Sequence, residues 1–170
     1  MKTRIIILLA FIGCLGVSAQ KFAYVDTEYI LNNIPSYKSA QEQLDKFSDT
    51  WQKEVDALYT QIDKMYKDYQ TEKVLLSEEM KKKKEDEIVS KEKEAKDLQK
   101  KYFGPEGLLF KKREELVKPI QEEVYKAVKE LSLDGSYAIV FDTSAGATVL
   151  FSDPKYDKSD AVLQKLGYKN

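Results

Sequence analysis

The feature that most constrains this chain is a stretch of 66 residues, Ser36 to Lys101, that contains neither glycine nor proline. Its first half carries apolar side chains at steps of three and four residues: Tyr37, Ala40, Leu44, Phe47, Trp51, Val55, Leu58, Ile62, Met65 and Tyr69. Such heptad spacing, here with one stutter after Trp51, is typical of a helix that packs along a partner helix. An unbroken helix over residues 37–74 would be roughly 57 Å long at about 1.5 Å per residue. A globular domain of this size cannot enclose it, so we expect the helix to project.

A second helix is predicted to return beside the first. Ser77 is a good N-cap, and the acids Glu78 and Glu79 after it complement the helix dipole, so the tip is expected near residues 75–78. Residues 72–101 contain ten lysines and nine acids, which indicates a solvated helix with a thin apolar seam.

Glycine and proline reappear at residues 103–107, where the helix is predicted to kink or break. A strong apolar stripe then resumes with Leu109, Leu116, Ile120, Val124, Val128 and Leu131. Pro119 lies within this stripe and predicts a bend or a local break. The two stripes can pair as an antiparallel coiled-coil hairpin, an arm that covers residues 36–131.

Both ends of the chain predict β-structure, which makes the fold α+β. Residues 22–26 have the composition of a strand, residues 137–142 and 148–151 are predicted to pair as a hairpin, and residues 157–166 should close the chain as a short helix. Together, residues 20–35 and 132–170 would form a small β/α body.

A body with so few elements buries little apolar surface, and its strands are apolar on both faces. We therefore expect other copies of the chain to complete the sheet. The predicted interface consists of Phe22, Tyr24, Ile139, Val140, Phe141, Val149 and Phe151.

The N-terminus has the pattern of a cleaved secretory signal. Lys2 and Arg4 precede the apolar run from Ile5 to Val17, and small residues end the segment at Ala19, so residues 1–19 should be removed. The alternative is a lipoprotein anchored through Cys14, which fits less well because the apolar run continues past the cysteine.

The composition argues against catalysis. The chain has no histidine, and its one cysteine lies in the signal, so a Ser–His triad, a thiol nucleophile and His/Cys zinc ligation are excluded. No glycine-rich phosphate loop occurs. Residues 142–144, Asp-Thr-Ser, follow a strand and are better explained as a turn that bonds its own backbone than as a phosphate or metal site. We expect no enzyme activity, no cofactor and no metal.

The charge balance argues against a nucleic-acid partner. Without the signal, 26 basic residues face 29 acidic ones, a net charge of −3.

Several segments resemble the Skp/OmpH family of periplasmic chaperones. Residues 22–26, Phe-Ala-Tyr-Val-Asp, followed by Tyr29-Ile30-Leu31, are similar to the family's start, and residues 34–37, Ile-Pro-Ser-Tyr, to its Bacteroidetes-type members. The C-terminal segments 138–142, 149–152 and 157–163 are similar as well.

This resemblance implies a jellyfish-shaped homotrimer in the periplasm, with a β body and three helical arms around a cavity. Members of the family hold unfolded outer-membrane proteins there without ATP. The best-known members are strongly basic, whereas this chain is slightly acidic, so no lipopolysaccharide site is carried over.

The outbound helix carries more aromatic surface than its partner can cover. Tyr59 and Tyr66 lie one heptad apart and off the main seam. Aromatic and methionine side chains suit promiscuous binding of unfolded proteins, hereafter clients. The predicted client-binding residues are Tyr59, Tyr66, Tyr69, Leu75, Leu76 and Met80, with hairpin packing as the alternative for the tyrosines.

The run Lys81-Lys82-Lys83-Lys84 could contact an anionic membrane surface or acidic clients. Three acids follow it directly, which favours a solvated helix face instead. The alternative function for the whole chain is a structural coiled-coil scaffold of the envelope that binds one defined partner.

Overall fold

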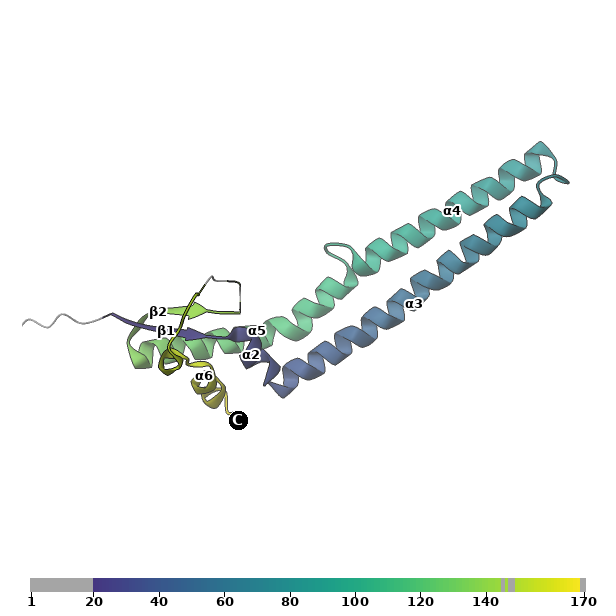
Figure 1. Ribbon diagram of the computed structural model, residues 1–170. Helices are drawn as coiled ribbons and strands as arrows, with labels where there is room; N and C mark the ends of the chain where they lie inside the picture. The colour runs from purple at the N-terminus through teal and green to yellow at the C-terminus, as the bar shows by residue number, and fades with distance from the viewer. Residues whose placement is uncertain (1–19, 145, 147–148, 169–170) are drawn as a thin grey trace, which may run out of the picture.

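The computed structural model describes residues 20–144, 146 and 149–168 (Figure 1). The predicted signal segment, with Cys14, lies outside these residues. Two long helices, α3 and α4, form a hairpin that extends far from the strands and from the C-terminal helix. None of the described helices is long and apolar enough to cross a membrane.

The hairpin begins and turns where the sequence predicts. Helix α3 spans Pro35–Glu72, with Pro35 in its first turn, and helix α4 spans Glu78–Phe103. Ser77 caps α4, since its hydroxyl accepts a hydrogen bond from the Met80 amide at 3.3 Å. The hydroxyl thereby satisfies one of the amides that a helix start leaves without a partner.

The predicted break after α4 is present. Residues 104–107 interrupt the helix, and α5 continues over Leu108–Gly135. A side chain at position 107 would place its Cβ 2.7 Å from the Tyr102 carbonyl oxygen, so the tight turn requires glycine there. Pro119 lies inside α5, which remains helical across it. The local break that was one of the two expected alternatives is therefore absent.

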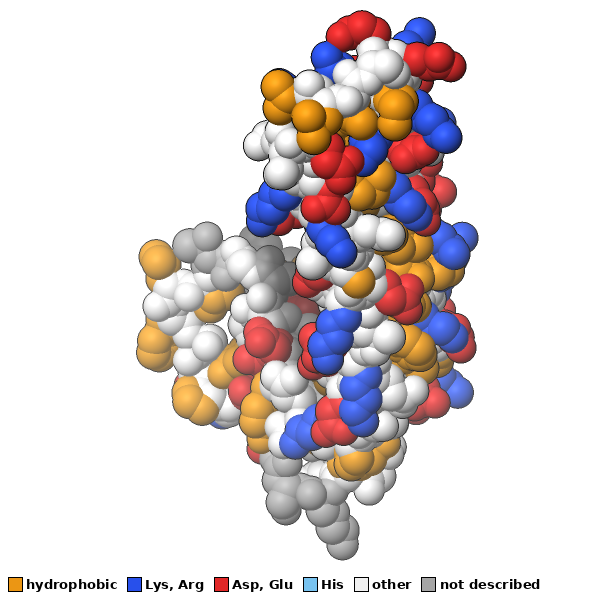
Figure 2. Space-filling view, turned by 90° about the vertical axis from the view of Figure 1, so that its right-hand side faces the viewer, with side chains coloured by type: hydrophobic (Ala, Val, Ile, Leu, Met, Phe, Trp, Pro, Cys, Tyr) orange, Lys and Arg blue, Asp and Glu red, His pale blue; other side chains and the backbone are white. Residues whose placement is uncertain are grey.

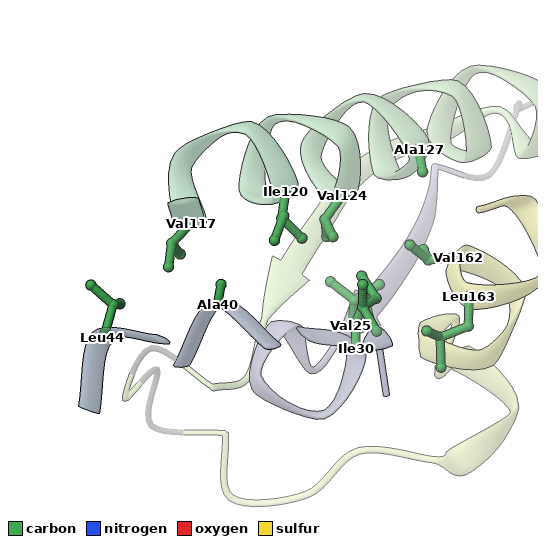
Figure 3. Close-up of a cluster of buried hydrophobic side chains, with 11 residues drawn as sticks. Val25, Ile30, Ala40, Leu44, Val117, Ile120, Val124, Ala127, Val162 and Leu163 are labelled. Atoms are coloured by element: carbon green, nitrogen blue, oxygen red, sulfur yellow. The ribbon is translucent and has the colours of Figure 1, made fainter. Parts of the chain in front are cut away.

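Helix α3 packs first on α5 and then on α4. Near its start, Ala40 and Leu44 face Val117 and Ile120 of α5 (Figure 3). Farther out, the buried side chains are Val55 and Ile62 in α3 and Ile88 and Ala95 in α4. The distal seam is thin, as its charged sequence predicts.

Two parallel strands lie before and after the long helices in the sequence. Strand β1, Lys21–Val25, pairs with β2, Tyr137–Asp142, so the whole helical hairpin is the connection between them. Phe22 lies opposite Ile139, and Tyr24 lies opposite Phe141, so the four side chains share one face.

The predicted hairpin between residues 137–142 and 148–151 is wrong for the residues that the structure describes, because 149–151 form no strand. In the sheet, β1 has β2 along one edge and the segment at Asp157 and Lys158 beside it. The Lys158 amide donates to the Tyr24 carbonyl oxygen at 2.9 Å.

A single core joins the strands to the helices. Helix α2 spans Thr27–Asn32, the short helix η1 spans Pro154–Tyr156, and α6 spans Ser159–Lys165. Figure 3 shows side chains from β1, α2, α5 and α6 converging on this core. Its central members are Val25, Ile30, Val124, Ala127, Val162 and Leu163. The last helix turns Val162 and Leu163 into this core, where both are buried.

Candidate functional site

One side of the arm carries a row of tyrosines that reach from α3 to α4. The Tyr59 hydroxyl donates to Gln99 Oε1 at 3.3 Å, and the Tyr66 hydroxyl donates to Glu92 Oε1 at 2.8 Å. The Tyr69 hydroxyl donates to Glu85. The three α4 partners are seven residues apart in sequence, so they lie on one side of that helix. We call these six residues, with Val89, the tyrosine face.

The tyrosine rings remain accessible although their hydroxyls are engaged. Tyr59 and Tyr66 are each 40% exposed, and Tyr69 is half-buried. The hydrogen bond to Glu92, with burial and the carboxylate charge, raises the pKa of Tyr66 above 10.0. The hydrogen bond to Glu85 likewise raises the pKa of Tyr69. These tyrosines therefore join the two helices, while part of each ring remains exposed.

The end of the arm is apolar and exposed. Val74 and Leu75 are 84% and 89% exposed, Met80 is exposed, and Leu76 is half-buried. Figure 2 shows hydrophobic side chains at this distal end among acidic and basic ones. Exposed apolar side chains gathered in this way are typical of contact surfaces.

The four consecutive lysines do not form a uniform basic patch. Lys81 pairs with Glu78 at 2.7 Å, and Lys84 pairs with Glu72. The hydrogen bond to Glu72 raises the pKa of Lys84, with smaller effects of Asp68 and Glu87 in the same direction. Residues 72–87 contain five lysines and six acids, so the charge near the tip is mixed.

The sheet exposes the apolar face on which Phe22, Ile139 and Phe141 lie. These side chains are 43%, 48% and 48% exposed. Phe22 and Phe141 border a hollow of about 890 Å³ whose lining includes Tyr24, Val149 and Phe151. Five of the seven predicted interface residues thus line this hollow, and Ile139 lies on the same side of β2 as Phe141. We call the surface of these six residues the sheet face.

Val140 lies apart from the other predicted interface residues. It alternates to the opposite side of β2 and packs against the core. Next to Val140, Asp142 accepts hydrogen bonds from the Thr27 amide at 3.2 Å and from the Ser144 amide at 3.0 Å. The expectation of a turn that bonds its own backbone at residues 142–144 is therefore confirmed.

The sequence interpretation missed the acidic half of the tyrosine face. Glu85, Glu92 and Gln99 repeat at the heptad spacing that also separates Tyr59 from Tyr66, a signal that the surrounding charges obscured. Val89, 61% exposed between Glu85 and Glu92, was also missed.

The comparisons with known proteins agree with this architecture. No curated protein matches the sequence. An OmpH-like protein of Caulobacter crescentus, proposed to be an outer membrane chaperone, has a similar solved structure, with a TM-score of 0.66 and 12% sequence identity. The similarity covers 89% of this chain and 86% of that one, and at this identity it concerns the fold. The sequence pattern of the outer membrane protein (OmpH-like) family matches residues 21–166. The chain therefore belongs to the OmpH-like family.

Proposed function

We propose that the protein is an ATP-independent, non-enzymatic chaperone that holds unfolded outer-membrane proteins in the periplasm. The observation that carries this proposal is the exposed aromatic and aliphatic surface along the arm, from Tyr59 and Tyr66 to Leu75 at the tip. A long arm with many modest apolar contacts suits weak, adaptable binding of extended chains better than binding of one folded partner.

Self-association is part of the proposal. The sheet face exposes large apolar side chains at Phe22, Ile139 and Phe141, and covering them with further copies would remove that surface from water. The trimeric number comes from the family resemblance. In this arrangement residues 20–35 and 132–170 form the body, and residues 36–131 form one of three arms around the client.

The periplasmic location rests on the predicted signal segment, residues 1–19, and on membership of the OmpH-like family. The ATP-independent role comes from the family resemblance.

The test is suppression of aggregation. An unfolded β-barrel outer-membrane protein is diluted from urea into buffer, and its light scattering is followed with and without the mature chain. We expect suppression at near-stoichiometric ratios and no effect of ATP. A structural scaffold with one defined partner would leave the scattering unchanged, and that result would overturn the proposal.

A further inference from the structure

We propose that the tyrosine face selects client segments in which aromatic or aliphatic side chains alternate with basic ones, and that Glu85 and Glu92 set this preference. This inference rests on the proposed chaperone function and specifies the chemistry of its ligand. Three features of the arm support it.

The first feature is the orientation of the tyrosines. The hydroxyls of Tyr66 and Tyr69 are bonded to Glu92 and Glu85, and the hydroxyl of Tyr59 is bonded to Gln99. A client therefore meets the rings. A ring face carries negative electrostatic potential and attracts a lysine or arginine side chain as well as another aromatic ring.

The second feature is the charge of Glu85 and Glu92. Neighbouring lysines are paired with other acids, Lys81 with Glu78 and Lys91 with Glu94, both at 2.7 Å. Glu85 and Glu92 instead accept from neutral tyrosine hydroxyls, which leave the negative charge in place. The raised pKa values of Tyr66 and Tyr69 reflect in part this negative charge beside the rings.

A carboxylate also has two oxygens and several lone-pair directions, so one tyrosine hydroxyl does not saturate it. A basic side chain placed over the Tyr66 ring can therefore contact both the ring and the remaining carboxylate oxygen of Glu92. An acidic side chain at the same place would be repelled by both.

The third feature is the apolar surface between the carboxylates. Val89 lies four residues after Glu85 and three before Glu92, so all three occupy one surface of α4. Its side chain is 61% exposed. An extended segment laid along the arm would place apolar side chains against Val89 and the rings, and basic ones against the carboxylates.

The experiment uses the mature chain and two short peptides with identical phenylalanine and serine positions, one with lysines and one with glutamates between them. Binding is measured by fluorescence anisotropy at low and high salt. We expect the wild-type chain to prefer the lysine peptide, with the preference falling as salt screens the contacts.

The decisive variant is E85Q/E92Q. Glutamine has nearly the same shape, and its carbonyl oxygen still accepts from a tyrosine hydroxyl, so the hairpin keeps its geometry while both charges are lost. We expect the preference for the lysine peptide to fall roughly three- to tenfold, the size expected for two exposed charge contacts. The matched control, E122Q/E123Q on α5, removes the same charge from exposed positions outside the tyrosine face and should keep the preference.

The outcomes separate the two proposals. If the unfolded outer-membrane protein and both peptides fail to bind the wild-type chain, the chaperone function itself is wrong. If the unfolded protein binds but the wild-type chain shows no lysine preference, the inference is wrong and the function stands. The inference is also wrong if E85Q/E92Q keeps the preference or if E122Q/E123Q loses it equally.

Discussion

Trp51 stacks on Tyr102 with ring centroids 5.0 Å apart and ring planes 4° from parallel. Phe47 extends the stack from the other side of Trp51, at 5.3 Å. Tyr102 lies in the last turn of α4, just before the break at residues 104–107, and its hydroxyl donates to Glu54 of α3. The stack thus fixes the arm near the region where α3 changes its partner from α5 to α4.

Replacing Trp51 with alanine should therefore destabilise the arm at its base. Burial and stacking of a large ring are lost, and because Trp51 is only half-buried we expect about 2 kcal/mol, less than for a fully buried tryptophan. Urea unfolding followed by circular dichroism at fixed protein concentration measures this free energy. The control is Tyr125→Ala, at a ring that is 71% exposed on α5. Equal losses for the two variants would mean that the stack adds nothing.

Much of the fold follows from local patterns in the sequence. The heptad stripe from Tyr37 to Tyr69, the Ser77 cap and the break near Gly104 determine helices and a turn through interactions between near neighbours, which sequence periodicity records.

Strand pairing depends on residues distant in the sequence, and the local sequence does not determine which of them pair. Residues 149–151 have strand composition, yet β1 meets Asp157 and Lys158, and Val140 turns to the core while its neighbours Ile139 and Phe141 remain exposed. Strand propensity reports a side chain's fit to a half-buried surface and leaves the pairing undetermined.

The tyrosine face shows the same division. Tyr59 and Tyr66 stand out in the sequence as aromatic residues beside the seam. Glu85 and Glu92 do not, because their role depends on the register between α3 and α4. That register becomes visible only when the two helices are placed together.

The sheet face should be the surface on which copies of the chain associate. Phe141→Asp would place a carboxylate within the apolar interface, where burying an unpaired charge costs several kcal/mol. We expect sedimentation equilibrium to report a trimer for the wild-type chain and monomers for this variant. Val74→Asp is the matched control, because it adds the same charge at an exposed apolar position far out at the tip. Dissociation by both changes, or by neither, would place the interface elsewhere.

The stability of the protein should depend on pH through the carboxyl group of Asp142. Burial raises the pKa of its carboxyl group, but hydrogen bonds from Thr27 and Ser144 outweigh this effect, so the pKa lies below the ordinary 3.8. A lowered pKa in the folded state adds stability above pH 3.8, and this contribution is lost as the pH falls through the folded value. Asp142→Asn should therefore destabilise the protein near neutral pH, and the difference from wild type should shrink below pH 3.8.

Thermal unfolding over a pH series measures this difference. Asp86→Asn, at an exposed position on α4, should change the stability little at any pH. A difference between wild type and Asp142→Asn that stays constant with pH would show that the carboxylate's charge is not what the hydrogen bonds stabilise.

The tyrosine rings should contribute more to client binding than the lysines near the tip. The variant Y59S/Y66S/Y69S removes three rings, each worth about 0.5–1.5 kcal/mol, so affinity for an unfolded client should fall by roughly one to three orders of magnitude. Y59F/Y66F/Y69F keeps the rings and removes only the hydroxyl groups that bond Gln99, Glu92 and Glu85. It should retain most of the affinity.

Replacing all four lysines from Lys81 to Lys84 with glutamine tests the competing explanation. Because Lys81 and Lys84 are already paired with Glu78 and Glu72, we expect a small loss of affinity that fades as salt rises. Client binding is measured at low and high salt, with circular dichroism as a check on helicity. If the serine variant binds normally and the glutamine variant does not, charge rather than aromatic surface holds the client.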